Sequence, residues 1–200
     1  MAEPIDFYFD FSSPYGYLAS TRIDAVAARH GRSVTWRPFL LGVAFKTTGQ
    51  TPLAEQPLRG PYSLRDFARS ARLLGAPFTL PTPFPFASLA ACRAFYWLVE
   101  RDAGKAKALA HAVYRAAFGE GRDVRAVDAV AGIAQGIGVD PAAVKAACDD
   151  PAVKEKLKAA TDAAIASGVF GSPFIIVDGE PFWGHDRLEQ VERWLATGGW

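Results

Sequence analysis

Strand-forming segments lie only near the two ends of this 200-residue chain, and the long region between them is helical. Ile5–Phe11 alternates in polarity and is rich in aromatic residues, which is typical of a buried strand, and Val34–Leu40 is predicted as a second strand. Phe174–Val177 and Glu180–Trp183 flank an Asp-Gly pair, which is a strong signal for a β-hairpin. We therefore expect the two ends of the chain to form one domain.

A helix is expected between the first two strands. Pro14 suits the first helical position, and Ser13 before it is a favourable N-cap. Apolar residues follow at helical spacing until Gly31, which ends the helix. The chain thus opens β-α-β, and the helix is long enough for a right-handed crossover between parallel strands.

The middle of the chain begins with Leu41–Gly60, which is predicted to be irregular because glycine and proline recur in it. A helix at Tyr62–Leu74 and a proline-rich loop at Gly75–Pro85 follow. The remaining helices are expected near Phe86–Arg101, Lys105–Phe118, Val124–Gly136, Pro141–Cys148, Pro151–Ser167 and Asp186–Trp194.

The element order β-α-β, helices, β-β-α predicts an α/β protein with a thioredoxin-like topology and a large all-helical insertion. We expect residues 1–40 and 170–200 to form a discontinuous thioredoxin-like domain. Residues 41–169 would form the helical insertion domain.

Composition and charge exclude several classes of protein. The chain has 22 Lys and Arg against 21 Asp and Glu, so its net charge of +1 favours neither nucleic-acid nor anionic-membrane binding. The longest uncharged stretch, Leu73–Cys92, contains several prolines and cannot be a membrane-spanning helix. No signal peptide and no metal-binding pattern is recognisable. A cytoplasmic enzyme or binding protein without a metal site is therefore expected.

The two cysteines, Cys92 and Cys148, form no C-x-x-C pair and are expected to be structural. The charge is locally uneven: the segment from Arg29 to Arg72 contains eight basic residues and only two acidic ones. Two interpretations are open for this segment: a solvated face, or a local field that attracts an anionic ligand.

Three separated segments carry candidate chemistry, and each also has a purely structural interpretation. In Phe9–Ser20, Ser13 is either a simple N-cap or part of a helix terminus that binds an anion. In Val169–Val177, Pro173 is either an ordinary trans proline at a strand start or a cis proline. A cis proline would turn the backbone of Ser172 towards a peptide-like ligand, which would pair with it as an added strand.

The third segment is Phe182–Gln190. Asp186 is either the N-cap of the last helix or a group that binds the ammonium of a ligand. His185 beside it is expected to be a surface residue, because no partner for it is visible in the sequence.

Five segments taken together resemble the 2-hydroxychromene-2-carboxylate isomerases, which group with the kappa-class glutathione transferases and the DsbA-like thioredoxin-fold proteins. The segments are DFYFDFSSPYGYLA, RPFLLG with FKTTGQTP, LRGPY with RDFARSARLLG, VFGSPFIIV, and WGHDRL. They occur in this order over nearly the whole chain, and their joint occurrence is more specific than any one of them.

The resemblance implies glutathione as cofactor, a small aromatic carboxylate as substrate, and a homodimer. Ser13 takes the place of the redox cysteine of the thioredoxin motif, and Ser172 before Pro173 would pair with the glutathione backbone. The other implied contacts are Trp183, Gly184, His185 and Asp186 for the γ-glutamyl end, Gln50 and Arg59 as polar and basic ligand contacts, and Lys46 and Phe84 for the aromatic substrate.

The chemistry expected of Ser13 is to donate a hydrogen bond to the cofactor's thiolate, with no covalent role. A free thiol has a pKa of about 8.5 and is mostly neutral at pH 7. A charge-assisted hydrogen bond of about 1.5–3 kcal/mol would lower that pKa by about one to two units. The thiolate would then add to 2-hydroxychromene-2-carboxylate and leave again, giving trans-o-hydroxybenzylidenepyruvate in aromatic hydrocarbon catabolism.

Two other functions stay open on the sequence. A kappa-class-like glutathione transferase would use the same thiolate and release a conjugate with a small electrophile. A non-enzymatic module would bind glutathione without turnover. A DsbA-like dithiol oxidoreductase is disfavoured, because Ser13-Pro14-Tyr15-Gly16 carries no sulfur.

Overall fold

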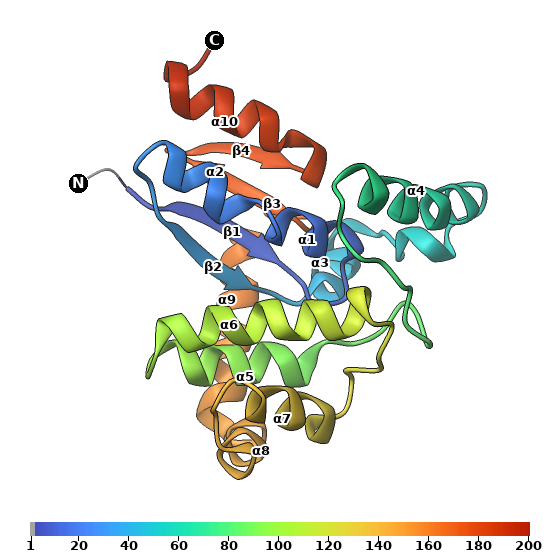
Figure 1. The fold of residues 1–200 in the computed structure, drawn as a ribbon, viewed down its shortest axis with the longest axis vertical. Helices are drawn as coiled ribbons and strands as arrows, with labels where there is room; N and C mark the ends of the chain where they lie inside the picture. The colour runs from blue at the N-terminus through green and yellow to red at the C-terminus, as the bar shows by residue number, and fades with distance from the viewer. Residues whose placement is uncertain (1–2) are drawn as a thin grey trace.

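A four-stranded sheet forms the centre of the protein (Figure 1). The computed structural model describes residues 3–200. β1 (Ile5–Phe9) pairs in parallel with β2 (Val34–Pro38) and antiparallel with β3 (Phe174–Val177), which pairs antiparallel with β4 (Glu180–Trp183). The sheet order β2-β1-β3-β4 joins the two ends of the chain, and the predicted thioredoxin-like α/β fold is confirmed.

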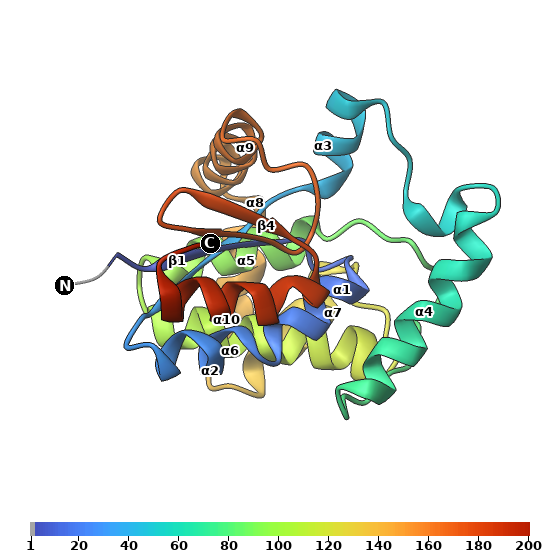
Figure 2. The same ribbon diagram turned by 90° about the horizontal axis from the view of Figure 1, so that it is seen from above.

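Helices cover both faces of this sheet, and α9 lies across the strands from α2 and α10 (Figure 2). The face of β1 that bears Ile5, Phe7 and Phe9 packs into the main core with α1, α2, α5 and α6. The opposite face packs with Phe39, Ala44 and Ala164 in a smaller cluster. The helices are α1 (Pro14–Ser20), α2 (Ile23–Arg29), α3 (Leu41–Thr48), α4 (Arg59–Leu73), α5 (Leu89–Val99), α6 (Ala103–Tyr114), α7 (Val127–Gln135), α8 (Pro141–Asp149), α9 (Pro151–Ala166) and α10 (Leu188–Thr197), with short helical turns η1 (Leu53–Glu55), η2 (Arg115–Gly119) and η3 (His185–Arg187).

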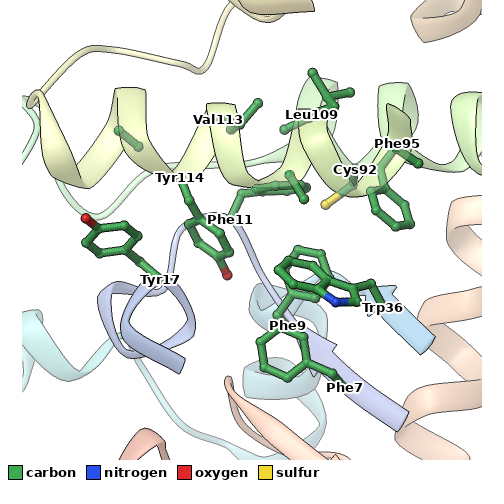
Figure 3. Close-up of a cluster of buried hydrophobic side chains, with 14 of the residues drawn as sticks. Phe7, Phe9, Phe11, Tyr17, Trp36, Cys92, Phe95, Leu109, Val113 and Tyr114 are labelled. Carbon is green, nitrogen blue, oxygen red and sulfur yellow. The ribbon is translucent and has the colours of Figure 1, made fainter. Parts of the chain in front are cut away.

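An aromatic cluster joins the sheet to the inserted helices (Figure 3). The ring of Phe9 lies 5.3 Å from that of Trp36 on β2, 6.0 Å from that of Phe95 on α5, and 5.7 Å from that of Tyr114 on α6. Aromatic pairs at such separations add to the free energy gained by burying the rings. The two predicted parts, residues 1–40 with 170–200 and residues 41–169, therefore both contribute side chains to one hydrophobic core.

Local signals in the sequence placed several elements correctly. Ser13 caps α1, because its Oγ accepts a hydrogen bond from the Gly16 N–H at 3.0 Å. Asp140 and Asp150 cap α8 and α9 in the same way, each followed by proline. The hairpin turn at Asp178 and Gly179 has φ values of 52° and 89°, as a two-residue turn of this type requires.

The helix predicted from Pro14 to Gly31 is interrupted. α1 ends at Ser20 and α2 begins at Ile23. The hydroxyl of Ser20 donates to the Tyr17 carbonyl at 2.6 Å, and that of Thr21 donates to the Leu18 carbonyl at 2.7 Å. Such side-chain bonds compete with the helical backbone ladder, which explains the break.

The prediction that Leu41–Gly60 is irregular was wrong in its first half, where α3 forms. Gly49 ends this helix in the left-handed conformation with a φ of 68°. At the other end, the Leu41 N–H donates to the Asp10 carboxyl at 2.7 Å. The hydrogen-bond acceptor at the start of α3 is thus remote in sequence.

No helix within residues 3–200 is both long and apolar enough to cross a membrane.

Replacing Phe9 by Ala should lower the free energy of unfolding by about 3–5 kcal/mol, because Phe9 is fully buried among aromatic rings of both parts of the chain. Leu73→Ala is the control, since Leu73 is 85% exposed and its loss should change stability by less than about 0.5 kcal/mol. Urea unfolding of the three proteins checks this. Similar midpoints for the Phe9 and Leu73 variants would show that the aromatic cluster does not join the two parts energetically.

Candidate functional site

A cavity of about 520 Å³ opens where four parts of the chain meet. Its walls are the start of α1, the segment from α3 to α4, the proline-rich loop at Phe84–Phe86, and the segments on either side of the β3–β4 hairpin. The volume lies within the range of small-molecule sites. The cavity is referred to below as the site.

The site collects nine of the eleven residues singled out from the sequence: Ser13, Gln50, Arg59, Phe84, Ser172, Trp183, Gly184, His185 and Asp186. Pro173 is buried directly after Ser172, and its carbonyl oxygen accepts a hydrogen bond from the Gly184 N–H at 3.1 Å. Lys46 is exposed on α3 and does not line the cavity.

The hydroxyl of Ser13 is buried at the base of the site. Besides accepting from the Gly16 N–H, it donates to the carbonyl oxygen of Ser172 at 2.8 Å. The Ser172–Pro173 peptide bond is cis, which is the second of the two interpretations that the sequence left open. The two segments that the sequence placed at opposite ends of the chain are thus in direct contact through Ser13 and Ser172.

Asp10 was not among the residues singled out from the sequence, yet its carboxyl organises the walls of the site. It is 3% exposed. Its Oδ1 accepts hydrogen bonds from the Ser12 N–H at 2.8 Å and the Ser88 hydroxyl at 2.7 Å, and its Oδ2 accepts from the Leu41 N–H at 2.7 Å. A polar residue inside the aromatic segment Ile5–Phe11 was the one available signal.

The backbone of Asp10 adds a second layer of contacts. Its N–H donates to Ser172 Oγ at 2.9 Å, and its carbonyl oxygen accepts from the Ser13 N–H at 2.9 Å and from the Tyr114 hydroxyl at 2.9 Å. Tyr114 is buried on α6, so the contacts tie Ser13 and Ser172 to the helical insertion. Hydrogen bonds to the backbone of Asp10 therefore fix the positions of both serines.

One rim of the site holds a cluster of ionisable groups. The Tyr15 hydroxyl donates to Asp66 Oδ2 at 2.6 Å, and Arg69 also pairs with Asp66. Burial, together with the bond to Asp66, raises the pKa of Tyr15 well above its usual value. Burial opposes ionisation of Asp66, but the hydrogen bonds from Tyr15 and Arg69 outweigh it and lower the pKa of Asp66. An ionised Asp66 and a neutral Tyr15 therefore face the site at neutral pH.

His185 is part of this rim, so the expectation that it is a surface residue was wrong. It is half-buried, and its ring stacks on that of Tyr15 at 4.8 Å with an angle of 6° between the planes. Burial lowers the pKa of His185, while the nearby carboxyls of Asp186 and Asp66 partly oppose the shift. The stacked Tyr15, which is remote in sequence, is the partner that the sequence did not show.

Asp186 is exposed beside His185 and lines the site. Its interpretation as the N-cap of the last helix was wrong. The N-cap positions of η3 and α10 are Gly184 and Arg187, and neither helix receives a side-chain cap. The Asp186 carboxyl is thus not committed to a helix terminus.

The site also has an aromatic wall, which adjoins Tyr15 of the ionisable cluster. Aromatic rings line it, with Phe67 4.9 Å from Tyr15 and 6.0 Å from Phe84, and Phe84 6.5 Å from Phe86. Arg59 lies in the lining as well, and its guanidinium reaches the Gln56 side chain at 3.4 Å. A cavity lined by both aromatic rings and a cation suits a flat anionic ligand.

Gly16 occupies the place of the second cysteine in a C-x-x-C motif that would begin at Ser13. A Cβ at this position would lie 2.5 Å from the Tyr114 hydroxyl and 3.0 Å from Ser172 Oγ. No side chain fits there unless Tyr114 moves. The packing therefore agrees with the absence of a second cysteine from this motif.

Comparison with known proteins gives the family. The family model of the DSBA-like thioredoxin domain matches residues 4–196. The chain is 32% identical to the 2-hydroxychromene-2-carboxylate isomerase of Sphingobium xenophagum over 197 residues, which is 98% of this chain and 99% of that protein. The chain belongs to this isomerase family.

Two further comparisons agree with the assignment. A solved structure of 2-hydroxychromene-2-carboxylate isomerase matches with a TM-score of 0.85 and 30% identity, covering 97% of this chain and 94% of that one. Glutathione S-transferase kappa 2 of Caenorhabditis elegans is 27% identical over 96% of this chain and 91% of that protein. The protein is thus an enzyme of the isomerase type, related to kappa-class transferases.

Gly16→Ala should lower the free energy of unfolding by about 1–3 kcal/mol, because the new methyl group meets the Tyr114 hydroxyl. Tyr114→Phe removes that hydroxyl, so the double variant should be less destabilised than the sum of the two single ones. Gly132→Ala on α7 is the control, since nothing lies within 4 Å of its Cβ position. Strict additivity in urea unfolding would show that Gly16 is not required by this contact.

His185 should make the protein less stable in acid. The pKa of an unfolded histidine is about 6.5, and the folded pKa is lower, so the unfolded chain binds more protons between the two values. Stability is therefore fully present above about pH 6.5 and falls as the pH drops towards the folded pKa. Urea unfolding at pH 7 and pH 5 should show a smaller loss for His185→Asn than for the wild type. Equal losses would contradict the burial of His185.

Proposed function

We propose that this isomerase uses glutathione as a cofactor to convert 2-hydroxychromene-2-carboxylate to trans-o-hydroxybenzylidenepyruvate. The observation that carries the proposal is the meeting of Ser13, Ser172 and Asp186 on the walls of one cavity that is also lined by aromatic rings. A thiol-bearing peptide would contact the polar residues, and the bicyclic substrate would lie on the aromatic wall. The names of the relatives, an isomerase and a glutathione S-transferase, support the same pair of ligands.

In the proposed complex the glutathione sulfur lies at the start of α1. Ser13 donates a hydrogen bond to it, and the helix N-terminus favours its negative charge. Ser172 pairs with the cofactor's backbone, and Trp183, Gly184, His185 and Asp186 surround its γ-glutamyl end. Asp186 is the group that binds the ammonium there, because its carboxyl has no helix terminus to cap.

The proposed reaction uses the thiolate as a nucleophile that is returned. The hemiketal ring of the substrate opens first: the bond between the ring oxygen and the carbon that bears the hydroxyl breaks, the hydroxyl proton moves to the freed phenol oxygen, and a keto group conjugated with the double bond forms. The sulfur then forms a bond to a carbon of that double bond, the electron pair moves to the keto oxygen as an enolate, and the former double bond becomes a single bond that can rotate. The carbon–sulfur bond then breaks, the double bond re-forms in the trans arrangement, and the thiolate is regenerated. No net oxidation or reduction occurs, and glutathione is not consumed.

The substrate's ring would lie on the wall formed by Phe67, Phe84 and Phe86. We assign its carboxylate to Arg59, a cation that lines the same cavity. Lys46, the cation implied by the resemblance, lies outside the lining. Gln50 and Gln56 supply further polar contacts in the same part of the site.

A homodimer and a cytoplasmic location complete the proposal. The resemblance to the family is their main support. The large apolar side chains of Leu58, Tyr62 and Leu64 are exposed in the first half of α4 or just before it, and a second copy of the chain could cover them.

The alternative is a transferase that releases a glutathione conjugate, and the similarity to the kappa-class protein favours it as the second candidate. Incubation of the purified enzyme with glutathione and 2-hydroxychromene-2-carboxylate separates the two. We expect the trans product to accumulate over many turnovers while the total free thiol stays constant. Loss of one thiol per substrate consumed would establish a transferase, and no reaction at all would overturn both.

Asp186→Asn should raise the KM for glutathione roughly tenfold or more while leaving kcat nearly unchanged, because an interaction made equally in the ground and transition states is lost. A hydrogen bond to a charged group contributes about 1.5–3 kcal/mol, which sets that scale. Glu189→Gln is the control, since Glu189 is exposed on α10 and does not line the cavity. Equal KM values for the two variants would remove Asp186 from the glutathione site.

A further inference from the structure

The basic segment Arg29–Arg72 divides into two halves that differ in how their charges are paired. Its first three basic side chains each form an ion pair at 2.7 Å with a carboxylate from elsewhere in the chain: Arg29 with Glu192, Arg32 with Asp178, and Arg37 with Asp6. A cation with a carboxylate at contact distance presents a dipole rather than a net charge, so its field decays quickly with distance. The first half of the segment is therefore a solvated face.

The second half lies on α3, on α4 and between them, and it keeps most of its charge. Arg69 pairs with Asp66. The other four cations of this half are exposed and have no carboxylate oxygen within 4 Å among residues 3–200: Lys46, Arg59, Arg65 and Arg72. Residues 41–73 contain five basic and two acidic residues, a net charge of +3, while the whole chain carries +1. The rest of the chain is thus at −2, and the positive excess of the protein lies on this one segment.

The charged segment borders the site. Arg59 lines the cavity itself, and α4 contributes Phe67 to the lining. Arg65 and Arg72 line a separate hollow on the same helix, so neither belongs to the walls of the cavity. With a rise of 1.5 Å per residue, they lie about 3 Å and about 7.5 Å along the helix axis from Phe67. Figures 1 and 2 show α3 and α4 on the side of the molecule where α1 begins.

Charges at such separations act on a small ion through the solvent. The Debye length is about 30 Å at 10 mM ionic strength and about 8 Å at 150 mM. At low ionic strength the fields of the four cations therefore add near the cavity, and salt removes most of their sum. A cleft with one sign of charge around it raises the association rate of oppositely charged ligands by about 10- to 1,000-fold.

We propose that Arg65 and Arg72 steer small anions into the site without touching the bound ligand. Lys46 and Arg59 add to the same field. The inference rests on the proposed function, because both proposed ligands are anions: the substrate carries one carboxylate, and glutathione carries two carboxylates against one ammonium. Long-range attraction acts before contacts form, so it changes the association rate constant and leaves the dissociation rate constant nearly unchanged.

The test measures association by stopped-flow fluorescence with two dyes that share an aromatic frame. Anilinonaphthalene sulfonate is an anion, while phenylnaphthylamine lacks the sulfonate and is neutral, and both brighten in an aromatic cavity. In the double variant Arg65→Gln with Arg72→Gln, we expect the association rate constant of the anion to fall about threefold at about 10 mM ionic strength and less than about 1.3-fold at about 200 mM. The rate constant of the neutral dye should be unchanged at both ionic strengths.

The matched control removes two cations from the opposite end of the molecule. Arg101 and Lys105 are exposed and have no carboxylate oxygen within 4 Å in the described part of the chain. They flank the turn between α5 and α6, which lies at the other side of the molecule from α4 in Figure 1. Arg101→Gln with Lys105→Gln lowers the net charge equally and should slow the anion less than about 1.3-fold. Glutathione, followed by the fluorescence of tryptophan because Trp183 lines the cavity, should respond to both variants as the anionic dye does.

Five results overturn the steering. An unchanged association rate in the Arg65 and Arg72 variant, or an equal fall in the control, shows that no local field acts. An equal fall for the neutral dye shows a change in the cavity itself. Faster dissociation of the anion shows that the arginines touch the bound ligand, and a site that does not bind the anionic dye has no anion to capture. If the anionic dye behaves as expected and glutathione does not bind, the steering stands and the proposed cofactor is wrong.

Discussion

The carboxyl of Asp10 accepts three hydrogen bonds in the interior, and the shape of the site depends on them. Its donors are the Ser12 N–H before α1, the Leu41 N–H at the start of α3, and the Ser88 hydroxyl just before α5. A buried carboxyl without such donors would be strongly unfavourable. The three segments are therefore held at the end of β1, and the cavity opens between them.

The same constraint places the two serines that we propose to handle the cofactor. The backbone of Asp10 bonds to Ser13 on one side and to the Ser172 side chain on the other. The Tyr114 hydroxyl, from α6, bonds to the Asp10 carbonyl and closes the space beside Gly16. A helical insertion and a thioredoxin-like sheet thus build one site, with the hydroxyl of Ser13 at the start of α1.

What could be predicted from the sequence was local in origin. The hairpin of β3 and β4 was placed to the residue because the Asp-Gly turn carries its own signal, and Ser13 with Pro14 marked the start of α1. What was missed depends on contacts between distant segments. The start of α3 is satisfied by Asp10, and the burial of His185 depends on stacking against Tyr15. No local pattern around Leu41 or His185 contains that information.

The central claim of the proposed mechanism is that Ser13 stabilises the thiolate of bound glutathione. The direct measurement is the thiol pKa of bound glutathione, followed by thiolate absorbance, in the wild type and in Ser13→Ala. The loss of the helix cap should cost about 0.5–2 kcal/mol of stability, which leaves the variant folded. The account predicts that the pKa in the wild type lies about one to two units below that in the variant, where it returns towards about 8.5. Coinciding titration curves would reduce Ser13 to a helix cap and contradict the proposed mechanism.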